Sequence, residues 1–328
     1  MLKLNSMKKL LAILLTFISL IFMPACKEAN AITVYAPDGA PALSLVKAIE
    51  SANEFEYNIV GADVIQTVVS GDKKADICIL PINLASKIIG SGNDYKMLGV
   101  VTHGNFYFAS KNETNINRQT VGELVGKTVG VVQLQSIAGL TLKASLSSLG
   151  VLYNELTGGA EKSQTAINLL PITPNEIGTA EVDVYLAPSP AVDVKSKVFN
   201  LSVVGSLKEL YGENGFPQAI IVCKNTVLEN NLTAVKNLIS KIKGVESYLL
   251  EKDVSEICSV VNSRLESGLS PSFNVNNLTK NSIINSSINF VSSKDCKGEV
   301  DEFISKIQAV SKGAVNTLFA DFYYLENI

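Results

Sequence analysis

The sequence predicts an α/β protein with two lobes, and three observations support this expectation. The chain has 328 residues, and a typical domain of roughly 150 residues makes that length suggest two domains. Hydrophobic residues make up 47% of the chain and charged residues 18%, which is enough to build cores and excludes a disordered protein. Strand-like and helix-like segments alternate along most of the chain, a pattern typical of α/β folds.

Short apolar strands alternate with helices in the first third of the chain. Runs rich in β-branched and aromatic residues predict strands, whereas apolar residues at three- and four-residue spacing predict helices. The expected strands are Ile32–Ala36, Tyr57–Gly61, Asp76–Leu80, Lys96–Thr102 and Phe106–Ser110. The expected helices are Ala42–Ser51, Asp63–Ser70 and the segment from Pro81 to Ile89.

The middle of the chain repeats this alternation. Thr120 followed by Glu123 has the spacing of a capping box, so we expect a helix at Thr120–Gly126. A second helix is expected at Ser136–Leu149, closed by Gly150. The expected strands are Thr128–Gln133, Ala166–Leu170, Val182–Leu186 and Ala219–Cys223.

Long helices are expected toward the C-terminus. Apolar residues at helical spacing occupy Leu228–Leu250, Val254–Leu265 and Val300–Val315. The stretch Ser272–Ser293 is rich in Asn and Ser, and we interpret it as helices with loops.

The N-terminus has the pattern of a signal peptide at residues 1–25. A basic segment with Lys3, Lys8 and Lys9 precedes the apolar run Leu10–Phe22, which is too short to span a bilayer comfortably. Met23-Pro24-Ala25-Cys26 resembles the lipobox of bacterial lipoproteins, in which the cysteine is acylated and becomes the first residue of the mature chain. An ordinary secretory peptide with a chance cysteine is the alternative.

The other four cysteines give no sign of a redox or metal site. Cys78 and Cys223 lie inside apolar runs, where a buried thiol is expected. Cys258 and Cys296 could form a disulfide, but spacing alone leaves this open. No CxxC is present, so we expect neither metal nor cofactor.

The scarcity of certain residues excludes several functions. Arginine occurs only at Arg118 and Arg264, His103 is the single histidine, and tryptophan is absent. A histidine triad or a histidine-rich metal site would have to be built around His103 alone. No basic block is interleaved with aromatics, so a nucleic-acid partner is not expected. No catalytic constellation is visible, and we do not expect an enzyme.

Candidate ligand-binding residues follow from a rule for α/β sheets, in which ligands lie beyond the carboxyl ends of the strands. Backbone N–H groups at helix starts there can bind polar or anionic groups. The candidates that share such loops are Asp38, Gly39, Ala40, Asn83, His103, Asn105, Gln135, Ser136 and Ser189. Because these loops contain no arginine, we expect a neutral or singly charged small ligand.

Each candidate also has a purely structural interpretation. Gly39 suits a tight turn, and Asp38 suits a cap of the first helix. Asn83 and Ser136 are ordinary helix N-cap residues. His103 suits a hydrogen-bonded position in a connecting loop.

Four segments resemble a known family. Ile32–Lys47 (ITVYAPDGAPALSLVK), Asp76–Ser86 (DICILPINLAS), Gly99–Ser110 and the closing Asp321-Phe322-Tyr323-Tyr324 resemble substrate-binding lipoproteins of bacterial ABC importers. The most similar branch comprises nitrate, sulfonate, taurine and thiamine-precursor binding proteins. The resemblance implies a type II periplasmic-binding-protein fold, with two mixed sheets flanked by helices, two crossing strands and a helical C-terminal part.

The resemblance also implies a domain organisation. Residues 26–31 would be the lipidated cysteine and a short tether, residues 32–101 plus 224–328 lobe one, and residues 102–223 lobe two. The crossings would be Thr102–Ser110 and Gln218–Lys224, and residues 321–324 would pack back onto lobe one.

The implied function is that of a monomeric, extracytoplasmic protein that a lipid anchors to the bacterial cell membrane. It would capture a small polar or planar ligand between the lobes and deliver it to an ABC permease and its ATPase. A sensor lipoprotein and an enzyme on the same fold are the alternatives.

Overall fold

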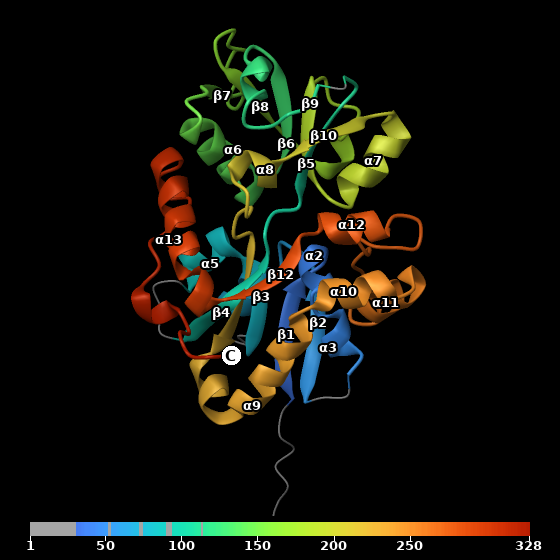
Figure 1. The fold of residues 1–328 in the computed structure, drawn as a ribbon, viewed down its shortest axis with the longest axis vertical. Coiled ribbons are helices and arrows are strands. Elements are labelled where there is room, and N and C mark those ends of the chain that lie inside the picture. Colours follow the sequence, from blue (N-terminus) through green and yellow to red (C-terminus); the bar gives the residue numbers. More distant parts are fainter. Residues whose placement is uncertain (1–30, 52–53, 72–74, 90–93, 113) are drawn as a thin grey trace, which may run out of the picture. The chain divides into compact units, whose positions relative to one another are not determined.

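The computed structural model describes residues 31–51, 54–71, 75–89, 94–112 and 114–328, which form two six-stranded mixed sheets flanked by helices (Figure 1). The predicted α/β class is confirmed. The expected signal peptide and Cys26 lie outside the described residues. None of the helices in the described ranges has the length and apolarity needed to cross a bilayer.

The first sheet takes strands from both ends of the chain, in the order β12-β4-β11-β3-β1-β2. Its strands are β1 (Ile32–Pro37), β2 (Phe55–Val60), β3 (Ile77–Pro81), β4 (Tyr95–Thr102), β11 (Ala219–Lys224) and β12 (Ile288–Ser292). Strand β1 is parallel to β2 and β3, and β11 is antiparallel to both β3 and β4. The first four strands therefore all point the same way, and β11 and β12 return against them.

Helices cover both faces of the first sheet, which explains why its central strands are apolar throughout. In β3, Ile77 and Ile79 belong to one hydrophobic cluster, whereas Cys78 and Leu80 belong to another. The first face is covered by α2 (Ala40–Leu43), α3 (Val46–Ile49), α9 (Asn225–Ile242), α10 (Val245–Glu251), α11 (Val254–Asn262) and α12 (Lys280–Asn285). The second face is covered by α4 (Ile65–Ser70), α5 (Ile82–Ile88) and α13 (Ser293–Val310).

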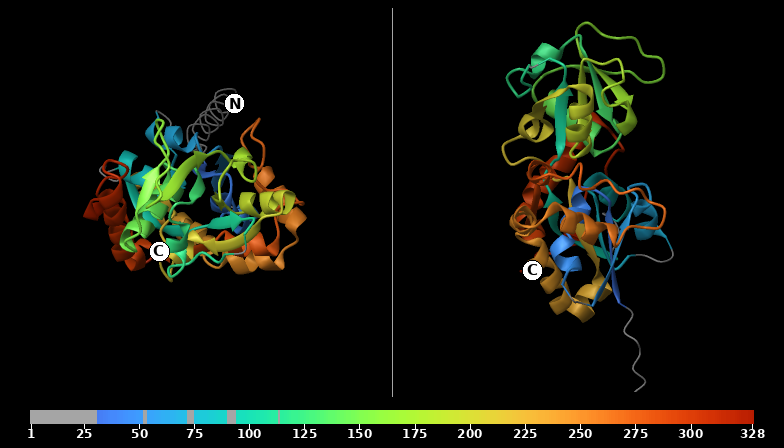
Figure 2. Two further views of the ribbon diagram at one scale, coloured as in Figure 1. Left: turned by 90° about the horizontal axis from the view of Figure 1, so that it is seen from above. Right: turned by 90° about the vertical axis from the view of Figure 1, so that its right-hand side faces the viewer.

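The second sheet comes from one continuous part of the chain and has the order β10-β5-β9-β6-β8-β7. Its strands are β5 (Phe106–Ser110), β6 (Thr128–Val132), β7 (Tyr153–Glu155), β8 (Ile167–Ile172), β9 (Val184–Pro188) and β10 (Ser202–Ser206). The accompanying helices are η1 (Val121–Leu124), α6 (Ile137–Ser148), η2 (Pro174–Glu176), α7 (Ala191–Phe199) and α8 (Leu207–Tyr211). The right-hand view of Figure 2 shows the strands of the two sheets as separate groups.

Helix α13 packs against elements of both sheets. It lies along α6 and against β4, and its Phe303 is fully buried. The ring of Phe303 stacks on Phe216 with centroids 5.8 Å apart and an interplanar angle of 13°. After α13 the chain returns to the first sheet, where Tyr324 donates its backbone N–H to Met97. The C-terminal tail thus packs onto this sheet, as the sequence predicted.

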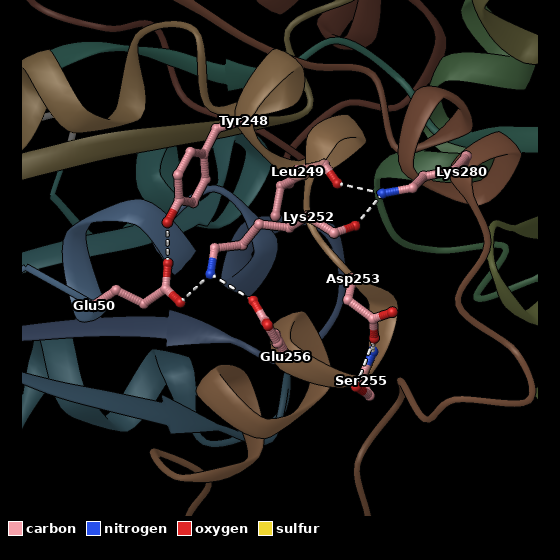
Figure 3. Close-up of polar contacts among 8 residues, drawn as sticks. All are labelled: Glu50, Tyr248, Leu249, Lys252, Asp253, Ser255, Glu256 and Lys280. Atoms are coloured by element: carbon pink, nitrogen blue, oxygen red, sulfur yellow. Dashed lines mark hydrogen bonds and ion pairs between the residues drawn. The ribbon is translucent and has the colours of Figure 1, made fainter.

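A polar cluster joins four helices on the first face of this sheet (Figure 3). Lys252 forms ion pairs with Glu50 (2.6 Å) and Glu256 (3.0 Å), and the Tyr248 hydroxyl donates to Glu50. Lys280 at the start of α12 donates to the carbonyl oxygens of Leu249 and Lys252. Because these charges satisfy one another, the cluster is a structural link between α3, α10, α11 and α12.

Several expected elements differ in the structure. The predicted helix Leu228–Leu250 is divided into α9 and α10, because Gly244 adopts a left-handed conformation with φ 69°. The predicted capping box at Thr120 is wrong: the Thr120 hydroxyl donates to the Asn115 carbonyl and the segment is a short 3-10 turn. The stretch Ser272–Ser293 contains the edge strand β12, which the sequence did not predict.

The cysteine expectations are also resolved. Cys78, Cys223, Cys258 and Cys296 are all buried and free. The disulfide left open between Cys258 and Cys296 is absent, and the two thiols belong to different hydrophobic clusters. Burial raises the pKa of Cys296 to about 12, so this thiol is protonated and unreactive at neutral pH.

Candidate functional site

The carboxyl ends of the parallel strands in the two sheets meet across a short connection. Strands β1 to β4 end at the edge where β4 leaves the first sheet. In the second sheet β6 to β10 are parallel and β5 is antiparallel to β9 and β10, so β5 enters at the edge where the others end. Only residues 103–105 separate β4 from β5. Four consecutive Cα–Cα steps span at most about 14 Å, so the two edges are within reach of one small molecule.

The β1–α2 loop holds three of the predicted residues. Gly39 has φ 113° and ψ −153°, a backbone conformation that residues with a Cβ avoid. The Asp38 carboxylate accepts hydrogen bonds from the backbone N–H groups of Gly39 (2.8 Å) and Ser272 (2.6 Å). Asp38 therefore ties this loop to the segment before α12, and Ala40 is buried at the start of α2.

Asn83 lies in the first turn of α5. The helix N-cap position belongs to Pro81, so Asn83 is not the N-cap residue that its structural interpretation would make it. Its Oδ1 atom is buried and has no hydrogen-bond partner within the described part of the chain. An amide oxygen buried in this way costs about 1–3 kcal/mol unless something binds it. Asn83 therefore suits contact with a ligand.

Asn105 and Ser189 lie together at the crossing. The Asn105 side chain donates to the Ser189 carbonyl (3.1 Å), and the Ser189 backbone N–H donates to the Asn105 carbonyl (2.8 Å). The Ser189 hydroxyl donates to Asp193 in α7. Both residues are almost fully buried, at 4% and 2% exposure, so they fix the crossing to β9.

Gln218 is a crossing residue that the sequence did not single out. Its Oε1 accepts from the Asn105 backbone N–H at 2.9 Å, and its Nε2 donates to Asn105 Oδ1 at 2.8 Å. The two connecting segments are thus held side by side by an amide pair. The only sequence signal for this pairing is that Asn105 and Gln218 both lie on segments expected to connect the two sheets.

His103 is the first residue of the connection between β4 and β5. Its backbone N–H donates to the Ser287 carbonyl just before β12, the edge strand of the first sheet. The residue is 8% exposed and its Nδ1 has no hydrogen-bond partner among the described residues. Burial, aided by the nearby Lys208, lowers the pKa of His103 to about 4, so the imidazole is neutral at pH 7.

The β6–α6 loop carries a second group of polar side chains. Gln133 has φ 57°, an uncommon backbone conformation for a residue other than glycine and one that often marks functional loops. The Ser136 hydroxyl donates to the Gln133 carbonyl (2.9 Å) and does not cap α6, although Ser136 occupies the N-cap position. Gln135 is exposed and donates to Glu155 (2.7 Å) at the end of β7.

Glu155 was also missed by the sequence, which gave no sign of β7. It forms an ion pair of 3.0 Å with Lys143, whose side chain is 1% exposed. The Lys143 ammonium is thus neutralised within the second sheet, while Glu155 positions the Gln135 amide at the edge that faces the first sheet.

The structure brings some of the predicted residues into contact and leaves others apart. It joins Asn105 to Ser189, and it places Asp38, Gly39 and Ala40 in one loop and Gln135 and Ser136 in another. The Asn83 turn, the Asp38 loop and the Ser136 loop lie on the facing edges without hydrogen bonds between them. A role in ligand binding for each residue stays a prediction.

A hollow of about 360 Å³ elsewhere is a less suitable candidate. It is lined by residues such as Phe55, Tyr57 and Lys241. Phe55 begins β2, so this hollow lies at the amino ends of the strands, away from the facing edges.

Comparisons with known proteins agree on the architecture. The solved structure of an ABC transporter from Parabacteroides distasonis has a TM-score of 0.68 at 16% identity, covering 90% of this chain and 99% of that one. The chain has the fold of ABC-transporter binding proteins. The periplasmic aliphatic sulphonate binding protein SsuA from Escherichia coli has a TM-score of 0.58 at 13% identity, covering 85% of this chain and 86% of its own.

A third comparison gives the same result. The alkanesulfonate-binding protein SsuA from Xanthomonas axonopodis pv. citri, bound to MOPS, has a TM-score of 0.58 at 15% identity, covering 90% of this chain and 99% of that one. No family model and no curated protein matches the sequence. At these identities the likeness establishes the fold.

Proposed function

We propose that this protein is an extracytoplasmic solute-binding protein that captures a small molecule and delivers it to an ABC importer. The observation that carries the proposal is the meeting of two carboxyl-terminal strand edges across residues 103–105. Lobe one would comprise residues 32–101 and 224–328, and lobe two residues 102–223. A ligand between them would touch the β1–α2 and β3–α5 loops on one side and the β6–α6 loop on the other.

The polar groups on the facing edges favour a neutral or singly negative ligand. Asp38 is already bound by two backbone N–H groups, and Lys143 is neutralised by Glu155. Arg118 donates to the carbonyl oxygens of Leu210 and Tyr211, so its guanidinium is bound to the C-terminal end of α8. The remaining groups are amides, a hydroxyl and the N-terminal N–H groups of α6, which bind a single negative charge without a counter-cation.

Alkanesulfonates fit this description and are the ligand class named for two proteins of the same fold. Their single charge suits the N-terminal N–H groups of α6. We therefore place alkanesulfonates first, before nitrate, bicarbonate and uncharged pyrimidines.

Binding would act through the crossing segments. A ligand that touches both edges stabilises the closed arrangement and shifts an open–closed equilibrium toward it. The permease and its ATPase would then recognise the closed form. We further propose that Cys26 is acylated and tethers the protein, as a monomer, to the outer surface of the cell membrane.

The experiment is a thermal-unfolding screen of residues 27–328 against alkanesulfonates, nitrate, bicarbonate, pyrimidines and thiamine precursors. A ligand present at 100 times its Kd adds about 2.7 kcal/mol to the free energy of unfolding, a shift that is readily measured. Ser136→Ala should weaken the positive compound about tenfold. Ser148→Ala, at the other end of the same helix, is the matched control and should not. The proposal would be contradicted if no compound in the panel raised the unfolding temperature and native mass spectrometry detected no co-purified small molecule.

A further inference from the structure

A second hollow lies beside residues 103–105, at the β12 edge of the first sheet. We name it the hinge hollow, and it has a volume of about 520 Å³. Its walls come from His103, from Lys208 on α8, from Glu246 on α10 and from Ser287, Asp295 and Glu299 around β12 and α13. In the first sheet β12 is the edge strand opposite β1 and β2, which separates the hinge hollow from the Asp38 loop.

The hinge hollow has an excess of negative charge. Four carboxylates line it, those of Glu213, Glu246, Asp295 and Glu299, against the single ammonium of Lys208. Within the described part of the chain, Glu213, Glu246 and Glu299 form no ion pair and accept no side-chain hydrogen bond. Burial raises the pKa of Glu246, and the charge of Lys208 only partly opposes this effect.

His103 supplies an independent indication of a ligand. The side chain is 8% exposed, lines the hinge hollow, and has a buried Nδ1 without a hydrogen-bond partner in the described residues. A neutral imidazole whose ring nitrogen is unpaired has lost hydration without compensation. An N–H donor reaching it from the hollow would supply the missing partner.

The spacing of the acidic groups indicates the kind of cation. Among the described residues, no three His, Cys, Asp or Glu side chains are close enough to hold a metal ion. Several separated carboxylates in one hollow instead suit a ligand whose positive groups are spaced along a chain. A volume of about 520 Å³ is also within the usual range for small-molecule sites.

We infer that the hinge hollow is a second binding site, which takes an aliphatic diamine or polyamine through Glu246, Glu299 and His103. Its walls join α8, which follows β10 of the second sheet, to α10 and α13, which belong with the first. A bound molecule would therefore contact elements of both sheets and shift the equilibrium between the open and closed arrangements. This inference does not depend on the identity of the ligand between the facing edges.

The test is isothermal titration calorimetry of residues 27–328 with 1,4-diaminobutane and spermidine at 150 mM NaCl. We expect one site per chain, bound at least tenfold more weakly by Glu246→Gln and by Glu299→Gln. The matched control is Glu181→Gln, which removes one exposed carboxylate from the loop before β9 and should leave the affinity unchanged. Equimolar 1-aminobutane should bind much more weakly than the diamine.

Two results would overturn the inference. One is the absence of binding heat with the wild-type protein at millimolar diamine. The other is an equal loss of affinity in Glu181→Gln and Glu246→Gln, because attraction to the overall negative charge of the protein would then account for the binding. Circular dichroism of each variant verifies that it is folded.

Discussion

The side-chain amides of Asn105 and Gln218 pair across the two segments that connect the sheets. Gln218 accepts from the Asn105 backbone N–H at 2.9 Å and donates to its Oδ1 at 2.8 Å. Asn105 is 4% exposed and also binds the end of β9 through Ser189. The pair therefore fixes the alignment of the crossing segments about which the proposed lobes would move.

Removing one amide should be costly because it leaves buried polar groups unpaired. We expect Gln218→Leu to lower the free energy of unfolding by about 2–3 kcal/mol, measured by urea denaturation. Gln119→Leu replaces an exposed glutamine and should change it by less than about 0.5 kcal/mol. Equal stabilities of the two variants would show that the amide pair contributes nothing.

His103 should make stability depend on pH. Its folded pKa is about 4 and its ordinary value is 6.5, so as the pH falls the unfolded chain takes up a proton first. The free energy of unfolding should decrease between pH 6.5 and about 4, by at most roughly 3 kcal/mol. His103→Gln should lack this part of the slope. Because His103 is the only histidine, parallel pH profiles for the two proteins would contradict the assignment.

Asn83 offers a way to separate a ligand-binding role from a structural one. Its Oδ1 is buried without a partner, so Asn83→Leu should leave stability unchanged or raise it. The same change should weaken the ligand found in the thermal screen about tenfold. Chemical denaturation and ligand titration of one protein preparation measure both effects. A destabilised variant with full affinity would instead assign Asn83 to the fold.

Gly39 should be required by its backbone conformation and not by lack of space. With φ 113°, an added Cβ would lie 3.9 Å from Pro41 Cδ, which is ordinary contact. We expect Gly39→Ala to cost about 1–2 kcal/mol of stability by backbone strain alone. Gly122→Ala, where nothing lies within 4 Å and φ is not positive, is the control. Thermal unfolding of the pair decides whether the strain is real.

Phe303 should be a major source of stability, because it packs α13 against both Phe216 and Tyr211. Phe303→Ala should lower the free energy of unfolding by about 3–5 kcal/mol. Phe319 is 55% exposed, and Phe319→Ala should change it by less than about 1 kcal/mol. A small effect at Phe303 would mean that α13 does not hold the two sheets' elements together.

The sequence predicted the elements whose pattern is local. The apolar run of β3 and the spacing of α6 indicated these elements to within about one residue at each end, because burial on one or two faces imposes such patterns. The helix expected at Val300–Val315 overlaps α13 but begins and ends several residues too late. Strand β12 was not predicted because it is a short edge strand that pairs only with β4 and lies within a stretch rich in Asn and Ser. Strand β7, with three residues, was too short to show alternation.

The candidate site was predictable only in part, for a similar reason. The rule that ligands lie beyond strand ends selected the Asp38, Asn83 and Ser136 loops, which do lie on facing edges. The rule did not select Gln218 or Glu155, because each acts through a partner that is distant in sequence. Gln218 is 113 residues from Asn105, and Glu155 is 20 residues from Gln135. The buried, unpaired state of Asn83 and His103 depends on their surroundings, which no local pattern records.

The most direct test of the central claim is equilibrium dialysis of residues 27–328 with the compound from the thermal screen, followed by mass spectrometry of what the protein retains. The proposed function predicts one molecule per chain, recovered with its mass unchanged. A compound that is not retained, or that is recovered chemically altered, would contradict a solute-binding role.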